Sequence, residues 1–184
     1  MNTIRSTKSL RPNTRPRRLI LIDIENFNGG PIQSSSQVEW CKSMLTRWLN
    51  IEDGEIIVIA SDESGLLAVN AGWKGPRLLM GVGADGADNQ LIEEIEYMNY
   101  GQFDEIALVS GDGIFADPVA RAAGLGVPTT VYSHGFQLSK RLQLAAVEVY
   151  LAEDGYGRKT TKTAETATTN ADIIQLYPNS KETA

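Results

Sequence analysis

Short runs of consecutive apolar residues alternate along this chain with stretches in which apolar residues recur every three or four positions. Such runs are typical of buried strands, and the wider spacing is typical of helices. We expect strands at residues 19–22, 56–60, 78–80, 106–109 and 129–132, followed by a last apolar run at 147–150. We expect helices at residues 38–49, 91–98, 119–123 and 139–146. Apolar strands that alternate with helices predict an α/β fold, in which a parallel sheet is covered on both faces.

One helix carries a stripe of large apolar side chains. In the segment 38–49, Trp40, Met44, Leu45 and Trp48 follow a spacing of three or four residues. This spacing places them on one side of the helix, and we expect that side to face the core.

The apolar pattern stops at both ends of the chain. Residues 1–17 contain two prolines and no apolar periodicity, and residues 152–184 include a stretch rich in Thr and Ala. Such compositions bury too little apolar surface to offset the entropy lost on ordering. The 184 residues therefore predict a basic disordered arm at 1–17, one domain at 18–151 and a disordered tail at 152–184.

Charge is distributed unevenly along the chain. The formal net charge is −6, yet residues 1–18 carry six basic groups and no acidic one. Residues 19–154 carry twenty acidic and seven basic groups. An acidic body does not favour general nucleic-acid binding, which depends on Lys and Arg, but it suits divalent cations. The basic arm is the segment that could contact a polyanion.

Cysteine and histidine are too rare for several classes of site. The chain has one cysteine, Cys41, and one histidine, His134, so an intramolecular disulfide and an all-Cys/His zinc site are excluded. No apolar run is long enough to span a membrane, and no signal-peptide core follows the basic N-terminus. These features favour a cytoplasmic protein without a membrane partner.

Acidic residues follow two of the predicted strands and open one of the predicted helices. Asp23 and Asp112 come directly after strands, and Asp88 lies at a helix start. Ligands of parallel α/β sheets bind beyond the carboxyl ends of the strands, so we expect these carboxylates to approach one another. They would repel unless a cation lay between them, and oxygen ligands suit Mg²⁺ or Mn²⁺. For Asp88 and Asp112, helix capping is the alternative role.

Further polar residues near this predicted edge are candidates for supporting roles. As ligands of a metal or contacts to a substrate we consider Asn26, Glu94, Ser110, Asp117, Lys140 and Arg141. Asp117 precedes Pro118 and is also a natural helix-start residue. Lys140 and Arg141 could hold a phosphate, or could simply be solvated charges.

Three segments resemble the motifs of one known family. They are LIDIEN at residues 21–26, GADNQL at 86–91 and LVSGDGIF at 108–115. Together, and in this order, they resemble the NYN domain of the PIN-like nucleases, whose members have D-x-x-N, G-x-D-x-x-L and S-G-D-x-D-F segments. The resemblance covers roughly residues 18–151.

The resemblance implies a Rossmann-like, three-layer α/β/α sandwich of PIN type. It also implies metal-dependent hydrolysis of RNA. By motif, Asp23, Asp88 and Asp112 match the metal-binding acids of the family, and Asn26 matches its Asn. Glu94 falls where many relatives have a further acid. Where the family has a second Asp in its third motif this chain has Ile114, and Asp117 is close enough in sequence to substitute.

The sequence thus predicts an endoribonuclease that uses Mg²⁺ or Mn²⁺ to hydrolyse RNA phosphodiesters. One alternative is a non-catalytic NYN-like module that binds RNA or a protein partner and serves regulation, which the loss of an acid at Ile114 would favour. Another is a different Mg²⁺-dependent phosphohydrolase on a similar sheet. A homodimer or a protein partner is compatible with each of these hypotheses.

Overall fold

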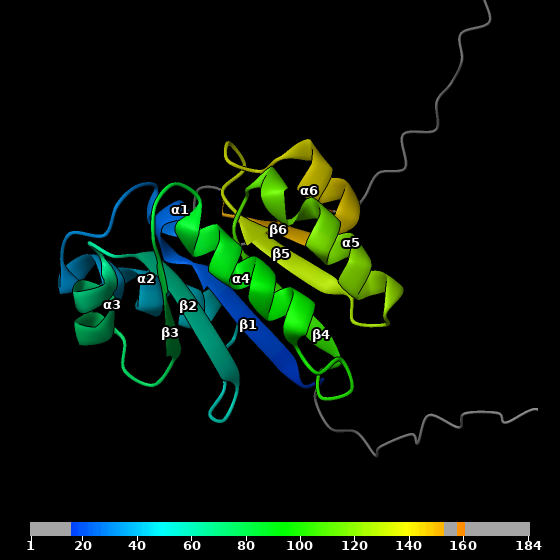
Figure 1. Cartoon of the computed structure of the whole chain (residues 1–184), viewed down its shortest axis with the longest axis horizontal. Coiled ribbons are helices and arrows are strands. Elements are labelled where there is room, and N and C mark those ends of the chain that lie inside the picture. Colours follow the sequence, from blue (N-terminus) through cyan, green and yellow to red (C-terminus); the bar gives the residue numbers. More distant parts are fainter. Residues whose placement is uncertain (1–15, 153–157, 161–184) are drawn as a thin grey trace, which may run out of the picture.

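The strands predicted from the apolar runs form a single sheet in the computed structural model, which describes residues 16–152 and 158–160 (Figure 1). The strands are β1 (Arg18–Asp23), β2 (Ile56–Asp62), β3 (Arg77–Gly81), β4 (Glu105–Val109), β5 (Thr129–Ser133), β6 (Glu148–Leu151) and β7 (Arg158–Thr160). Their order across the sheet is β3-β2-β1-β4-β5-β6-β7. Strands β1 to β6 pair in parallel, and β7 pairs antiparallel with β6.

Helices cover both faces of this sheet. They are α1 (Ile24–Asn28), α2 (Ser35–Trp48), α3 (Leu66–Gly72), α4 (Gly86–Tyr97), α5 (Ala116–Gly124) and α6 (Lys140–Ala145), with a 3₁₀ turn η1 (Gly113–Phe115) before α5. Helices α4, α5 and α6 pack on the face turned toward the viewer in Figure 1, and α2 and α3 pack on the opposite face. The protein is therefore a three-layer α/β/α sandwich of the Rossmann-like kind, as the sequence predicted.

Strand β1 shows why its residues are apolar without interruption. Leu19 and Leu21 belong to the core under α4 and α5, whereas Ile20 and Ile22 belong to the core under α2 and α3. Successive side chains of a strand point to opposite faces, so a strand with both faces covered must be apolar at every position. The pattern breaks at Asp23, where the strand ends.

The sheet order reverses between β1 and β4. Chain connections run outward from β1 through β2 to β3, and then return to β4 on the other side of β1 before continuing through β5 to β6. This is the strand order of a doubly wound sheet, and its ligand crevice lies beyond the carboxyl ends of the two central strands. Asp23 ends β1, and Ser110 follows β4 directly.

Some elements were not predicted. The short helices α1 and α3 and the turn η1 lie in segments without a periodic apolar pattern, because a helix of five to seven residues makes at most two turns. Strand β7 lies within 152–184, which was predicted to be a disordered tail; that prediction is wrong for residues 158–160. The remaining predictions for the arm and the tail concern residues 1–15, 153–157 and 161–184, which lie outside the described residues.

The stripe predicted for α2 is confirmed at Leu45, which is fully buried, and corrected at Trp40. The side of α2 that faces the sheet carries Val38, Cys41 and Leu45, all fully buried, whereas Trp40 is 48% exposed. Trp40 comes one residue before Cys41, which is about 100° around the helix, so the indole lies beside the buried side and not on it. There it stacks on Phe27 of α1.

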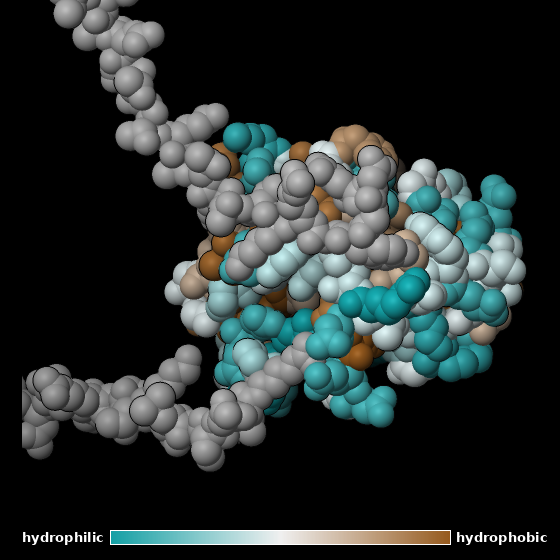
Figure 2. All heavy atoms as spheres, turned by 180° about the vertical axis from the view of Figure 1, so that it is seen from behind, coloured by the Kyte–Doolittle hydropathy of each residue, from teal (hydrophilic) through white to brown (hydrophobic). Residues whose placement is uncertain are grey.

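The outer surface mixes polar and apolar side chains. Seen from the back, the described part of the surface is mostly hydrophilic or neutral, with separate hydrophobic patches between (Figure 2). Among the described residues, no helix has the length and apolar character needed to cross a lipid bilayer.

Candidate functional site

A cavity of about 320 Å³ opens at the carboxyl ends of β1, β2 and β4, next to the start of α4. Six carboxylate side chains line it, namely Asp23, Glu25, Asp62, Asp85, Asp88 and Asp112. The other lining residues are Asn26, Gly30, Pro31, Gly83, Gly86 and Ala87, so among the described residues no Lys, Arg or His side chain contributes to the wall. We call this cavity the acidic pocket. It brings together the three aspartates predicted from the sequence.

Asp23 is the most deeply buried of these acids, with 5% of its surface exposed. Its Oδ1 accepts a hydrogen bond from the Asn26 amide (3.1 Å), which caps the N-terminus of α1. Its Oδ2 accepts a hydrogen bond from the Ser110 hydroxyl (3.0 Å). Burial raises the pKa of Asp23 to about 7, the negative charge of Asp88 adds to the rise, and the two hydrogen bonds oppose it. The carboxylate is thus held in place by its neighbours without a positive charge to balance it.

Asp88 lies in the first turn of α4. Two glycines place that turn, because the end of β3 at Gly81 packs directly against the backbone of Gly86 and Ala87, where a Cβ on Gly81 would overlap main-chain atoms. Burial raises the pKa of Asp88, and the charges of Asp112 and Asp85 raise it further, while a hydrogen bond with Asp23 lowers it. The close packing of Gly81 on Gly86 and Ala87 therefore keeps Asp88 next to Asp23.

Asp112 is exposed and reaches the pocket from the segment after β4. Its Oδ1 accepts a hydrogen bond from the Ile114 amide (2.9 Å), so the capping role considered for it is also present. The Asp112 amide donates to the Ser110 hydroxyl oxygen (3.2 Å), so Ser110 links Asp23 and Asp112. The Asn26 side-chain oxygen accepts from the Gly111 amide (3.1 Å). Ser110 and Asn26 therefore hold the segments that carry Asp23 and Asp112 by hydrogen bonds.

Three acids of the pocket, Glu25, Asp62 and Asp85, were not predicted as site residues from the sequence. The Glu25 Oε1 accepts hydrogen bonds from the Ser61 hydroxyl (2.6 Å) and the Asp62 amide (3.3 Å). Its Oε2 is buried and has no hydrogen-bond partner among the described residues. Asp62 ends β2, so the rule that located Asp23 would have found it. Glu25 was not predicted because no helix was expected at residues 24–28. The first turn of that helix, α1, directs the Glu25 side chain toward Ser61 of β2.

Five candidate residues do not line the acidic pocket. One of them, Ser110, contacts the Asp23 and Asp112 segments by hydrogen bonds. Asp117 was proposed to replace the acid lost at Ile114, but it lies in the first turn of α5, its side chain is 77% exposed, and it pairs with Arg141 (3.1 Å). Glu94 follows Asp88 by six residues, which is not a whole number of helical turns, so the two side chains lie on different sides of α4. Glu94 pairs with Arg77 of β3. Arg141 is engaged with Asp117, and Lys140 is exposed beside it at the start of α6.

The kinds of donor in the acidic pocket fit a hard divalent cation. All six charged donors are carboxylates, and the buried Glu25 Oε2 is an oxygen without a hydrogen-bond partner among the described residues. As the side chains stand, however, no three acidic, histidine or cysteine side chains in the described part of the chain are grouped closely enough to hold a metal ion. Mg²⁺ commonly keeps several waters and uses only one or two carboxylates, so a tight three-residue group is not required for it.

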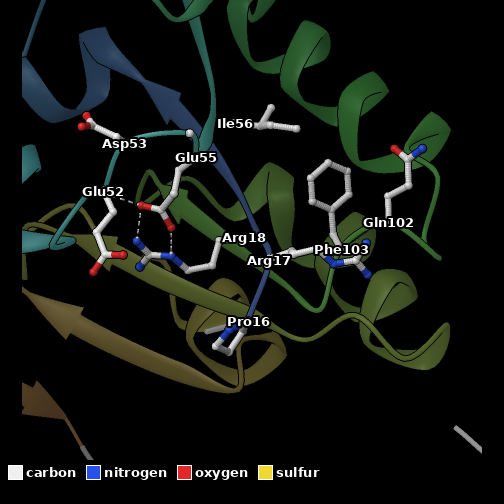
Figure 3. Close-up of a pocket in the computed structure, with 10 residues that line it drawn as sticks. Pro16, Arg17, Arg18, Glu52, Asp53, Glu55, Ile56, Gln102 and Phe103 are labelled. Atoms are coloured by element: carbon white, nitrogen blue, oxygen red, sulfur yellow. Dashed lines mark hydrogen bonds and ion pairs between the residues drawn. The ribbon is translucent and has the colours of Figure 1, made fainter. Parts of the chain in front are cut away.

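A larger cavity lies at the opposite, amino edge of the sheet. It has a volume of about 510 Å³ and is lined by residues of three segments, 16–18, 52–56 and 102–103. The Arg18 guanidinium faces the Glu55 carboxylate there, with two hydrogen bonds of 2.7 Å each (Figure 3). The buried Arg18 charge is thus paired with a carboxylate, whereas the charged side chains of the acidic pocket are all carboxylates, which makes the smaller pocket the better candidate for chemistry.

The sheet order and the acidic pocket together define a Rossmann-like α/β protein with a carboxylate site at its topological switch point. No known family model matches the chain, and no curated protein is similar to it. A solved structure of a protein of unknown function from Vibrio parahaemolyticus is similar to it, with a TM-score of 0.58 and 18% sequence identity. The similarity covers 81% of this chain and 100% of that one. At this identity it shows a common fold.

Proposed function

We propose that this protein is a metal-dependent endoribonuclease whose active site is the acidic pocket. The observation that carries the proposal is the gathering of six carboxylates at the switch point of the sheet, in a pocket to whose wall the described part of the chain contributes no cationic side chain. Buried carboxylates of like charge are costly unless a cation balances them. The resemblance of residues 21–26, 86–91 and 108–115 to the NYN motifs supports RNA as the substrate.

Asp23, Asp88 and Asp112 would hold Mg²⁺ or Mn²⁺ in this proposal. When bound, such an ion lowers the pKa of a water molecule and offsets the charge that develops on a phosphodiester during hydrolysis. Ser110 keeps the Asp23 and Asp112 segments in register through its two hydrogen bonds. Asn26 fixes Gly111, and with it the backbone that carries Asp112. These two residues would act by positioning the acids.

In this proposal, acids other than Asp117 compensate for the missing fourth acid. Ile114, which stands where the resembled family has Asp, packs against the core beneath α4 and α5. Glu25 and Asp62 bring two other carboxylates to the pocket from α1 and β2. We propose that they, rather than Asp117, supply the remaining negative charge.

The alternative function is a non-catalytic module that binds RNA or a protein partner. It is favoured by the absence of a tight group of three metal ligands in the described residues. The apolar Ile114 favours it as well. In this alternative the acidic pocket would be a degraded site, and metal would change neither the stability of the fold nor any cleavage.

The cytoplasm is the compartment we propose, since the single cysteine excludes an intramolecular disulfide. RNA is the proposed partner, and a homodimer or a protein partner remains compatible with the exposed apolar side chains on several elements, among them Leu67 and Leu144.

The test is cleavage of a labelled single-stranded RNA by the full chain with Mg²⁺ or Mn²⁺. We expect cleavage that EDTA abolishes and that Asp112→Asn reduces by about 100-fold or more, the scale of losing one charged group at a reacting centre. The matched control is Asp117→Asn, since Asp117 is also an exposed aspartate near the same turn but lies outside the pocket. Equal loss in both variants, or no metal-dependent cleavage by folded protein, would favour the non-catalytic module.

A further inference from the structure

Four aromatic rings form a continuous stack beside the acidic pocket. They are Trp40 of α2, Phe27 of α1, and His134 and Phe136 of the segment after β5. Phe27 lies against Trp40 at a centroid distance of 5.9 Å and against His134 at 5.3 Å, and His134 lies against Phe136 at 5.5 Å. The planes of successive rings differ by only 22° to 28°. We call this stack the aromatic row.

Solvent exposure increases toward the two ends of the aromatic row. Phe27, in the middle, is 4% exposed, whereas Trp40 is 48% and Phe136 is 86% exposed. A phenyl ring that is so exposed to water lacks most of the stabilising free energy that its burial would provide. The row therefore ends in a phenyl ring that is left open to solvent, and a further planar ring could stack there.

The segment that carries the outer ring is fixed to the rest of the site. The His134 Nε2 lies 2.9 Å from the Phe27 carbonyl oxygen, and the Gln137 side-chain amide donates to the Asn26 carbonyl (2.9 Å). The Gln137 amide closes the turn around Phe136 by donating to the His134 carbonyl (3.0 Å). Such anchoring reduces the entropy lost when a ligand binds.

The aromatic row and the acidic pocket share helix α1, and the segment before Asp112 contacts the segment that carries Phe136. Asn26 lines the pocket and precedes Phe27 in α1. Gly111 precedes Asp112, and its Cα packs so closely on the Gln137 carbonyl that an added Cβ would lie 2.5 Å from that oxygen. A polymer that places one phosphodiester at the pocket could therefore extend along the same edge of the sheet toward the row.

We infer that the aromatic row is a stacking site for a base of the strand whose phosphodiester lies in the acidic pocket, so that the protein selects single-stranded nucleic acid. The inference rests on the proposed function for the position of the phosphodiester. Bases in a duplex already stack on both faces, whereas an unpaired base has a free face for an aromatic side chain. The acidic body supports the same choice: with few Lys and Arg available for phosphates, base stacking must contribute a larger share of the affinity.

The test compares two probes of equal length and equal phosphate count. One is a ten-nucleotide single-stranded RNA and the other is the corresponding abasic sugar–phosphate strand. Binding of each to the full chain is measured by filter retention in EDTA, where no cleavage takes place in the proposed mechanism. We expect the RNA to bind about tenfold more tightly than the abasic strand, the scale of one stacked base.

Variants of the outer ring identify the site of that preference. Phe136→Ala should remove the preference for the base-containing strand, and Phe136→Trp should retain it. The matched control is Tyr97→Ala, because Tyr97 is 82% exposed at the end of α4 and lies outside the aromatic row. A preference that survives Phe136→Ala, equal binding of the two probes, or no measurable binding of the RNA would overturn the inference. Equal binding would favour a protein as the occupant of the row.

Failure of this inference and failure of the proposed function give different results. Binding in EDTA does not require a metal, so the base preference and its loss in Phe136→Ala can be observed even if the protein cleaves nothing. Conversely, metal-dependent cleavage that Asp112→Asn abolishes, together with equal binding of the two probes, would keep the nuclease and remove the stacking site.

Discussion

The two edges of the sheet differ in whether a buried charge is balanced by a charge of opposite sign. At the amino edge, the Arg18 side chain is only 6% exposed, and its guanidinium donates to the Glu55 carboxylate and to the Leu49 carbonyl oxygen (3.0 Å). At the carboxyl edge, Asp23 is buried to a similar degree, but its charged neighbours in the acidic pocket are other carboxylates. The same fold therefore contains one balanced and one unbalanced charge.

This difference separates a structural site from a candidate functional one. The amino-edge cavity is the larger of the two, at about 510 Å³ against about 320 Å³, so volume alone would have selected the other edge. A buried charge that is fully paired satisfies the requirements of the fold by itself. An arrangement that leaves several carboxylates unbalanced costs stability, and such costs are tolerated where a ligand is bound.

The largest effect is expected from removing the balanced charge. Arg18→Met would leave the Glu55 carboxylate, which is 12% exposed, without its guanidinium. Breaking a buried pair from one side costs about 3 kcal/mol or more, because the remaining charge stays desolvated. We expect the free energy of unfolding, measured by urea denaturation, to fall by about that amount.

The neighbouring arginine provides the control for this prediction. The Arg17 side chain also pairs with an acid, Asp104, but both side chains are more than 40% exposed. Arg17→Met should cost less than about 1 kcal/mol, as is usual for exposed ion pairs. If both variants lost the same stability, the pairing of Arg18 and Glu55 would not explain why this edge tolerates a buried charge.

A smaller loss is expected at the carboxyl edge from Gly81→Ala. The added Cβ would overlap the backbone of Gly86 and Ala87, so the start of α4 must move and take Asp88 with it. Overpacking of this kind costs about 1 to 3 kcal/mol. We expect lower stability in thermal denaturation, together with weaker cleavage in the assay proposed above.

Gly124→Ala is the matched control for that glycine. Gly124 ends α5, and a Cβ there would meet no atom within 4 Å. Its substitution should leave stability unchanged or raise it by about 0.5 kcal/mol. Intact activity in Gly81→Ala would show that the position of Asp88 is not set by the close contact between β3 and α4.

The sequence was most informative where a single physical rule applies. Residues 19–22 are apolar throughout because β1 is covered on both faces, and this pattern predicted both the strand and the parallel sheet. The rule that ligands bind beyond the carboxyl ends of strands placed Asp23 and Asp112 at one edge. Asp88 joined them by its place at a helix start, and the structure brings all three to one pocket.

The sequence was least informative where position depends on contacts between distant segments. Asp117 seemed able to reach the pocket, but η1 and the start of α5 carry it to Arg141 instead. Glu25 reaches the pocket through a five-residue helix and a hydrogen bond to Ser61, 36 residues away. Such a placement has no periodic signal, because it depends on how β1 and β2 are paired rather than on local pattern.

Replacement of the buried Asp23 is expected to raise the free energy of unfolding. Asp23→Asn keeps an oxygen that can accept from the Asn26 amide, and it removes a negative charge that burial and Asp88 disfavour. The folded protein holds the Asp23 proton up to a pKa of about 7, whereas the unfolded chain releases it near the ordinary value of 3.8. Stability therefore falls as the pH rises from about 4 toward 7, and the asparagine variant should not show this fall.

At pH 7 in EDTA, Asp23→Asn should thus be more stable than the wild type by about 1 kcal/mol or more. Asp112→Asn is the comparison, because Asp112 is exposed and an asparagine still caps the turn at Ile114, so its stability should hardly change. Added Mg²⁺ or Mn²⁺ should raise the melting temperature of the wild type and leave Asp23→Asn unaffected, since ligand that binds only the folded state stabilises it. A destabilised Asp23→Asn would show that the carboxylate at this edge is balanced after all, and the contrast between the two edges would no longer mark a functional site.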